Sequence, residues 1–438
     1  MKRGITGTLS VGCIIFVVLI CAFTSLPQPV KAANAATVTV GGVPYAVAFT
    51  PDGKYAYVPN FSENVSVINT ATNKVTAVIP TQNWPNGIAI TPDGKYAYVT
   101  DTNTGTNQEG LVSVISTASN KVTATITVGG NPNTGVAITP DGKYVYVTND
   151  DGAVAVISTA TNSVTANITI ASLTATTTIG GISMPSGSSL PQAVAITPNG
   201  EYAYVACADG AISAINTSTN TVEATINLGY GDTPNALAIT PNGEYAYVCV
   251  GTSNSSMISV ISTATNTVTA TIVDSAAPSG VAITPDGKYA YVTNYFNDSV
   301  SVINTATNTV DQTVTVGSSP YGIAITPNGE YAYVTNLVSV ATQSPVADWV
   351  GAVSVISTAT NTAPTASSSP AVPEFPTQSL TVALLVCIVI VLSIVIIAMK
   401  KAEKSNSAKI SQEKTSNSKN STDQQSNITF FSIFLIRR

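Results

Sequence analysis

The residues that could carry chemistry in this chain are limited by the absence of histidine. None of the 438 residues is His, which excludes Ser-His-Asp and Cys-His nucleophiles, imidazole-bound metals and a histidine pH switch. Carboxylates, Tyr, Lys and Ser remain available for catalysis or binding. Only 9% of the residues are charged, against about 25% in average soluble proteins, so Thr, Ser and Asn must solvate most of the surface.

Acidic and aromatic side chains in the predicted loops form the candidate binding set. Aromatic rings offer apolar faces for stacking, and neighbouring carboxylates and amides add polar specificity, which suits a carbohydrate or protein partner. The alternative is that the rings only pack between structural units. The candidates are Trp84, Asp101, Asp150, Asp151, Asp209, Tyr295, Phe296, Asp298 and Trp349.

Two adjacent carboxylates in this set raise the question of a metal ion. Calcium prefers carboxylate and carbonyl oxygens, which Asp150-Asp151-Gly152 could supply. The sequence around them has no acidic ligands at alternating positions. We therefore predict no cofactor and no metal, with calcium as the open alternative.

The elements that position these residues come from one unit that recurs seven times. Each copy carries alternating segments separated by turn residues, for example 281–284, 289–292, 301–303 and 310–316 in the sixth copy. Four short antiparallel strands in about 43 residues are typical of one propeller blade. We therefore predict an all-β fold, a seven-bladed β-propeller over residues 36–362. The motif Thr-Pro-(Asp/Asn)-Gly-(Lys/Glu)-Tyr begins at Thr50, Thr91, Thr139, Thr197, Thr240, Thr284 and Thr326.

The two ends of the array predict how the ring closes. The seventh copy has a third strand at 353–356, but Pro364 interrupts its fourth, because Pro cannot donate to a central ladder. Residues 36–42 resemble 124–130, the fourth strand of the second copy. We therefore expect the N-terminal strand to complete the last blade, which removes two exposed sheet edges.

The repeated strings also carry a family resemblance. Tyr98-Val99-Thr100, Tyr146-Val147-Thr148-Asn149, Tyr291-Val292-Thr293-Asn294 and Tyr333-Val334-Thr335-Asn336 each follow a Pro-Asp/Asn-Gly turn. They resemble the YVTN family of β-propeller repeats, which is common in archaeal surface-layer and cell-surface proteins. The resemblance implies the fold and a surface location, and it implies no particular ligand.

Charge separates between the two faces of the predicted propeller. The scaffold face, formed by the first-to-second and third-to-fourth turns, carries all six lysines of residues 36–362. The loop face, formed by second-to-third loops and blade connections, carries ten acids and no base. With six Lys, no Arg and nineteen acids, the propeller has a formal net charge of −13, which disfavours nucleic acid as a partner.

The segments outside the propeller predict its location. A basic start followed by an apolar run indicates a signal peptide over residues 1–35. A Pro/Ser/Thr-rich linker at 363–379 precedes a transmembrane helix at 380–399. Basic residues then open a disordered tail at 400–438, which the positive-inside tendency places in the cytoplasm. We expect an extracellular propeller anchored in the cytoplasmic membrane, with glycosylation candidates at Asn60, Asn64, Asn167, Asn216, Asn254 and Asn297.

The linker and the apolar segment carry a second resemblance. Pro373-Glu374-Phe375, the apolar segment 380–399 and the basic residues after it resemble an archaeal PEF-type C-terminal sorting signal. The resemblance implies cleavage near the tripeptide and transfer to a surface anchor. In that family the chain ends soon after the basic cluster, whereas here it continues to Arg438. A plain membrane anchor is the alternative.

Together these features predict a non-enzymatic cell-surface or surface-layer protein. Its acidic, aromatic loop face would bind a surface protein, a cell-wall glycan or a cation. Two alternatives stay open. One is a lyase, lactonase or glycosidase that uses carboxylates on the same scaffold, and the other is a passive subunit of a surface lattice.

Overall fold

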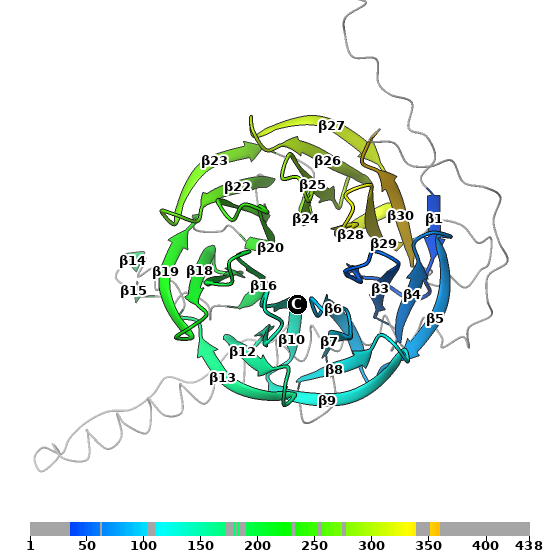
Figure 1. Ribbon diagram of the computed structural model, residues 1–438. Coiled ribbons are helices and arrows are strands. Elements are labelled where there is room, and N and C mark those ends of the chain that lie inside the picture. The colour runs from blue at the N-terminus through cyan, green and yellow to red at the C-terminus, as the bar shows by residue number, and fades with distance from the viewer. Residues whose placement is uncertain are drawn as a thin grey trace, which may run out of the picture. The chain divides into compact units, whose positions relative to one another are not determined.

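The computed structural model describes residues 36–61, 64–102, 110–171, 178–179, 182–183, 190–229, 233–251, 256–273, 277–338 and 351–359. The chain divides into Met1–Phe375 and Pro376–Arg438, and every described residue belongs to the first unit. Seven four-stranded antiparallel sheets are arranged around a central axis, with the first strand of each blade innermost (Figure 1). The prediction of an all-β, seven-bladed propeller is confirmed.

The strands of the first four blades have the following bounds. Blade 1 contains β2 (Ala48–Phe49), β3 (Tyr55–Asn60), β4 (Asn64–Asn69) and β5 (Lys74–Pro80), and blade 2 contains β6 (Trp84–Ile90), β7 (Tyr96–Thr102), β8 (Gly110–Ser116) and β9 (Lys121–Gly129). Blade 3 contains β10 (Pro132–Ile138), β11 (Tyr144–Asn149), β12 (Ala153–Ser158) and β13 (Ser163–Thr169), and blade 4 contains β16 (Pro191–Ile196), β17 (Tyr202–Cys207), β18 (Ala211–Asn216) and β19 (Thr221–Asn227).

The remaining blades repeat this order. Blade 5 contains β20 (Thr233–Ile239), β21 (Tyr245–Gly251), β22 (Ser256–Ser262) and β23 (Thr267–Val273), and blade 6 contains β24 (Pro278–Ile283), β25 (Tyr289–Asn294), β26 (Ser299–Asn304) and β27 (Thr309–Thr315). Blade 7 contains β28 (Ser318–Ile325), β29 (Tyr331–Val338), β30 (Ala352–Ser357) and β1 (Ala36–Thr39). The connection between blades 3 and 4 includes the short pair β14 (Thr178–Ile179) and β15 (Ile182–Ser183).

The ring closes through its N-terminal strand. β1 pairs antiparallel with β30, with Ala36 opposite Val355 and Thr39 opposite Ala352. The side chain of Val38 is buried in a cluster that joins blades 7 and 1. The predicted exchange of the N-terminal strand is confirmed, and it leaves the seventh blade with the same four strands as the others.

The repeated turn is built from its own side chains. In blade 1 the hydroxyl of Thr50 donates to Asp52 Oδ1 at 2.6 Å and accepts from the Tyr55 amide at 3.1 Å. The Lys54 amide donates to the same Asp52 oxygen at 3.1 Å. Gly53 has φ = 70°, which favours glycine. The turn residues therefore fix the hairpin and explain why the motif recurs in every blade.

Adjacent blades are joined by a hydrogen bond between Tyr and Asn. The hydroxyl of buried Tyr98 in blade 2 donates to Asn162 Oδ1 of blade 3 at 2.6 Å. Asn162 occupies the left-handed region at φ = 49°, in the turn between the two outer strands. Five further pairs repeat this contact: Tyr57 with Asn120, Tyr146 with Asn220, Tyr204 with Asn266, Tyr247 with Asn308, and Tyr333 with Asn73.

The hydrophobic core lies between the blades. It consists of seven clusters of buried side chains, six of which contain one of these tyrosines. Cys207 and Cys249 are buried in two different clusters and form no disulfide. Burial raises the pKa of Tyr98 to about 12, so its hydroxyl remains a donor at physiological pH.

The predicted signal peptide (1–35), linker (363–379), transmembrane helix (380–399) and tail (400–438) lie outside the described residues. Within the described part of the chain, no helix has the length and apolar character needed to cross a membrane.

The blade contacts lead to a stability prediction. Tyr98→Phe removes the donor to Asn162 while keeping the ring, so the free energy of unfolding should fall by about 1 kcal/mol. Tyr96→Phe is the matched control, because Tyr96 lies in the same strand with 41% of its surface exposed. Urea denaturation of both variants tests this prediction, and equal effects of the two substitutions would contradict it.

Candidate functional site

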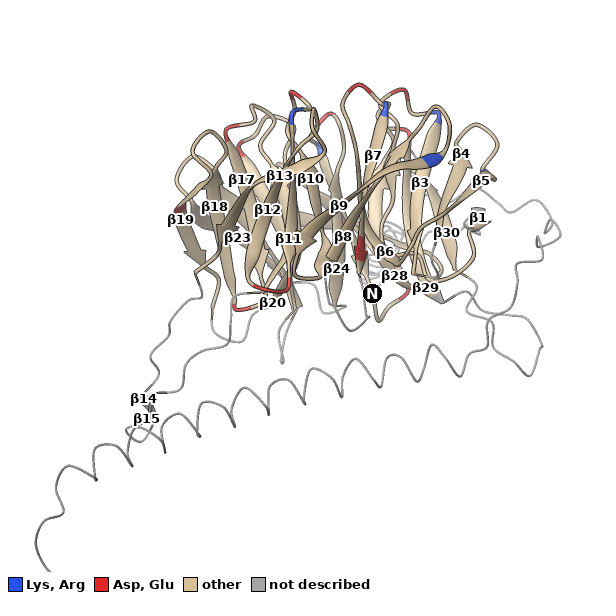
Figure 2. Cartoon of the chain, turned by 90° about the horizontal axis from the view of Figure 1, so that it is seen from below, with Lys and Arg blue, Asp and Glu red and all other residues tan. Residues whose placement is uncertain are grey.

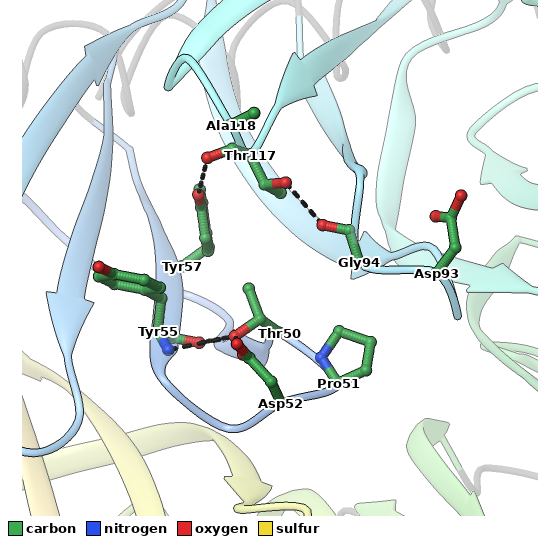
Figure 3. Close-up of a pocket in the computed structure, with 9 residues that line it drawn as sticks. All are labelled: Thr50, Pro51, Asp52, Tyr55, Tyr57, Asp93, Gly94, Thr117 and Ala118. Atoms are coloured by element: carbon green, nitrogen blue, oxygen red, sulfur yellow. Dashed lines mark hydrogen bonds between the residues drawn. The ribbon is translucent and has the colours of Figure 1, made fainter.

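A pocket of about 330 Å³ lies between blades 1 and 2 on the scaffold face (Figure 3). Thr50 holds Asp52, and Thr117 donates to the carbonyl of Gly94 at 2.6 Å. Hydrogen bonds from Thr50 and the Lys54 amide lower the pKa of Asp52 to about 2. Such a carboxylate is a weak base at neutral pH. The lining residues all belong to repeated turns or strands, namely Thr50, Pro51, Asp52, Tyr55, Tyr57, Asp93, Gly94, Thr117 and Ala118, which indicates a structural role.

In the Pro-Asp/Asn-Gly turns of this face, each acidic side chain has a partner within its own turn. Lys54 contacts Asp52 at 3.0 Å, and the Pro-Asp-Gly-Lys turns of blades 2, 3 and 6 have the same pair at 2.9–3.0 Å. In blades 4, 5 and 7 an Asn amide donates to Glu at 2.8 Å instead. The lysines lie along one edge of the propeller, whereas acids lie at both edges (Figure 2). The loop face therefore carries acids without lysine in the described propeller.

Asp101 is not exposed on the loop face. It lies in β7 with 0% of its surface exposed, so it is not accessible to a ligand as we expected from the sequence. Ser113 Oγ donates to Asp101 Oδ2, and Oδ1 has no hydrogen-bond partner among the described residues. Burial raises the pKa of Asp101 to about 7, against the opposing effect of the Ser113 hydrogen bonds.

The other blades explain this placement. Asp101 occupies the position of the Asn that ends the Tyr-Val-Thr-Asn string. In blade 6 the amide of Asn294 donates to Ser301 Oγ at 2.9 Å, and in blade 7 Asn336 donates to Ser354 in the same way. A neutral amide suits this buried position, whereas a carboxylate at the same place must give up its hydration.

Asp150 and Asp151 lie together on the loop face of blade 3. Both side chains are exposed, and both contact the segment that leads from β9 into β10. The amide of Gly130 donates to Asp151 Oδ2 at 3.3 Å, and Asn131 Nδ2 donates to Asp150 Oδ2 at 3.4 Å. A Cβ added to Gly130 would lie 2.6 Å from Asp150 Oδ1 and 2.9 Å from Asp151 Cγ. The two carboxylates therefore converge on one glycine.

The local environment raises the pKa of Asp150. Desolvation by the surrounding atoms is the largest cause, and the charge of Asp151 adds to it against the hydrogen bonds from Asn131. Asp150 is therefore an exposed loop-face carboxyl whose pKa is raised toward neutral pH. This is the direction required of a general base.

The remaining acidic candidates have structural surroundings. Asp298 accepts from the Ser319 amide at 2.8 Å and so connects blade 6 to the start of blade 7. Asp209 lies half-buried in the turn between β17 and β18. Trp349 lies outside the described residues. Within the described chain, no three acidic or cysteine side chains are grouped as metal ligands.

Four aromatic side chains form a continuous row on the loop face, which we call the aromatic arc: Tyr321, Tyr45, Phe61 and Trp84. Their successive ring centroids are 5.2, 5.4 and 4.8 Å apart. All four are half-buried and come from blades 7, 1 and 2. Of these four, only Trp84 was among the sequence-predicted candidates. Tyr45 and Tyr321 each follow a Pro at or near the start of an innermost strand.

The two aromatic candidates of blade 6 lie next to this arc. Tyr295 and Phe296 contact each other with ring centroids 5.3 Å apart, and Phe296 is 77% exposed. Burial raises the pKa of Tyr321, and the charge of Tyr295 raises it further. Trp84, Tyr295 and Phe296 therefore lie on the loop face, as predicted.

One glycosylation candidate is unsuitable in the folded protein. Asn60 is fully buried, and its amide donates to Val40 O, Asn64 Oδ1 and Ser66 Oγ. The other sequon residues differ in accessibility: Asn167 and Asn297 are exposed, Asn64 and Asn216 are half-buried, and Asn254 lies outside the described residues.

The fold and the loop face define a seven-bladed propeller that presents an acidic pair and an aromatic row on one side. The family described as "Lactonase, 7-bladed beta-propeller" matches residues 85–343. Since this span exceeds half of the chain, the protein belongs to that family. Membership of a lactonase family contradicts the prediction of a protein without enzymatic activity.

A solved structure shares the fold. A chain of Kuenenia stuttgartiensis hydrazine synthase has 21% sequence identity and a TM-score of 0.60, and the similarity covers 76% of this chain and 98% of that chain. At this identity the similarity shows the fold alone. No curated protein sequence matches the chain.

The buried carboxyl of Asp101 predicts a pH-dependent stability. Its folded pKa of about 7 exceeds the ordinary value of 3.8, so the folded protein holds a proton that the unfolded chain releases between these pH values. Stability should therefore fall as pH rises through this window, on the order of 2–4 kcal/mol. Asp101→Asn should remove the dependence and raise the melting temperature above pH 7.

The reverse substitution provides the control. Asn294 is 2% exposed at the equivalent position of blade 6, so Asn294→Asp should introduce the same loss of stability at rising pH. Thermal unfolding of both variants between pH 4 and 8 measures the effect. Parallel pH curves for wild type and Asp101→Asn would contradict the assignment.

Proposed function

We propose that the protein is a hydrolase of cyclic esters and that the reaction takes place on the loop face at Asp150 and Asp151. The proposal rests on membership of the lactonase family over residues 85–343. The convergence of two carboxylates on Gly130 and the raised pKa of Asp150 support the choice of site.

The chain restricts which group can activate water. There is no histidine, so a carboxylate is the available base of suitable strength near neutral pH. Asp52 and its counterparts Asp93, Asp141 and Asp286 have pKa values of about 2. Asp101 is buried and does not reach a substrate. Asp150 combines exposure with a raised pKa, which favours it as the general base.

The proposed reaction consumes only the lactone and one water molecule. Asp150 accepts a proton from water as the oxygen attacks the lactone carbonyl carbon. The ring C–O bond then breaks, and the departing oxygen takes the proton held by Asp150, which gives a hydroxy acid and restores the Asp150 carboxylate. The charge of Asp151 raises the pKa of Asp150 and so favours the protonated form of Asp150 during the attack.

The proposal predicts the effect of one isosteric substitution. Asp150→Asn removes the base, so kcat for hydrolysis of γ- and δ-lactones by the full-length protein should fall roughly 10²–10⁴-fold. In the unsubstituted protein, the rate of lactone hydrolysis should fall as the pH is lowered through the pKa of Asp150, because only the carboxylate form accepts a proton from water. That pKa lies above the ordinary value of 3.8. A pH-stat assay measures both effects.

Asp141→Asn is the matched control. Asp141 belongs to the same blade on the scaffold face, and blades 4, 5 and 7 have Asn at the equivalent position. This variant should keep full turnover. Absence of lactone hydrolysis by the unsubstituted protein, or unchanged turnover in Asp150→Asn, would refute the proposal.

We also propose that the propeller lies outside the cell and is held by the C-terminal apolar segment. The support is the order of sequence segments: an apolar leader at 1–35, a span at 380–399 and basic residues directly after it. Labelling of intact cells with a membrane-impermeant amine reagent should modify the propeller lysines. Modification only after lysis would contradict this location.

A further inference from the structure

We propose that the aromatic arc binds a chain of uncharged sugar rings. The arc provides stacking surfaces from three blades, with neighbouring rings 4.8–5.4 Å apart. Several adjacent stacking positions suit an oligosaccharide better than a single small ring. The inference goes beyond ester hydrolysis, because the arc contains no acid or base.

The arc is separate from the structural core of the propeller. None of its four residues belongs to the seven hydrophobic clusters between the blades. The aromatic rings that do stabilise the blades are the repeated tyrosines, such as Tyr57, which are fully buried. Because the arc residues stay half-buried on the loop face, part of each side chain remains available to a ligand.

The residues equivalent to Tyr45 and Tyr321 add hydrogen-bonding groups around the axis. Each blade has one residue directly after the Pro that lies at or near the start of its innermost strand. The amide of Asn133 donates to Pro191 O at 2.7 Å, and the hydroxyl of Ser279 donates to Pro320 O at 2.9 Å. These side chains therefore lie at the boundary between neighbouring blades. In order from blade 1 to blade 7, the seven residues are Tyr45, Asn86, Asn133, Gln192, Asn235, Ser279 and Tyr321.

The chemistry of these seven positions identifies the class of ligand. Six of these side chains, two phenols and four amides, are half-buried and offer polar atoms and apolar faces without any charge, whereas Ser279 is buried and donates to Pro320 O. Hydroxyl-rich rings with apolar faces match this combination. The described loop face has no Lys or Arg to bind an anion, and its carboxylates repel one. The ligand is therefore a neutral carbohydrate.

One end of the arc lies near the proposed hydrolytic site. Trp84 pairs with Thr102 in the sheet of blade 2, and the Thr102 hydroxyl donates to Pro132 O of blade 3 at 3.3 Å. Asn131, the preceding residue, donates to Asp150. A bound oligosaccharide can therefore extend from the arc toward the acidic pair, although its binding does not require hydrolysis.

The test measures binding of four neutral pentasaccharides to the full-length protein. Calorimetry and tryptophan fluorescence with cellopentaose, maltopentaose, mannopentaose and penta-N-acetylchitopentaose should detect at least one ligand. Trp84→Ala and Phe61→Ala should each weaken that binding roughly tenfold, which corresponds to the loss of about one aromatic contact. Trp84→Phe keeps a stacking ring and should bind within a few-fold of the unsubstituted protein.

Two control variants check that the arc itself is the binding surface. Tyr144→Ala removes a 40% exposed ring from the scaffold face and should leave binding unchanged. Asp141→Asn, also on the scaffold face, should bind normally. Binding is measured without lactone turnover, so a failure of the hydrolytic proposal does not affect this result. The inference fails if none of the four ligands binds, if Trp84→Ala binds as well as the unsubstituted protein while its melting temperature is unchanged, or if anionic pentagalacturonate binds as tightly as the neutral ligands.

Discussion

The arrangement of the blades depends on the hydrogen bond between a buried Tyr hydroxyl and an Asn whose backbone is in the left-handed region. Dispersion and hydrophobic contacts hold neighbouring sheets together, but they permit sliding. The Tyr98–Asn162 bond is directional and links the second strand of one blade to the outer turn of the next. Because Asn162 has positive φ, the turn presents its Oδ1 in one orientation. Repetition of this contact fixes the position of each blade against the next and so determines which residues meet on the loop face.

This repeated frame allows single positions to change without loss of the fold. The same loop-face positions carry different side chains in different blades, and each change has a local physical consequence. At the end of the second strand, Asn294 donates to Ser301, whereas Asp101 must accept from Ser113 and remain largely desolvated. At the innermost strand, Tyr45 and Tyr321 replace amides and place two rings 5.2 Å apart. The scaffold face shows no comparable diversity, because Thr50 and its counterparts must complete the turn.

The sequence predicted the fold well because seven copies of one motif leave few arrangements that bury every blade. It also predicted ring closure, since 36–42 resembles a fourth strand that blade 7 lacks. Trp84, Tyr295 and Phe296 were placed on the correct face by strand order alone. Asp101 was misplaced because its charge suggested exposure, although alignment of the repeats puts it at the buried Asn position. Contacts between blades, such as Tyr45 with Phe61, depend on side-chain packing across sheets, which no local pattern encodes.

The shortage of basic groups has a consequence for how a lactonase on this scaffold would work. The loop face has no lysine among its described residues, and the propeller sequence has no arginine, so no basic side chain of the described face stabilises an anion. The acidity of Asp150 is instead adjusted by desolvation and by the charge of Asp151. A neutral cyclic ester approaches such a face without electrostatic cost, whereas its hydrolysis product carries a new carboxylate. Repulsion from Asp150 and Asp151 then favours product release over rebinding. The same charges that disfavour anionic ligands would therefore speed the release of the product.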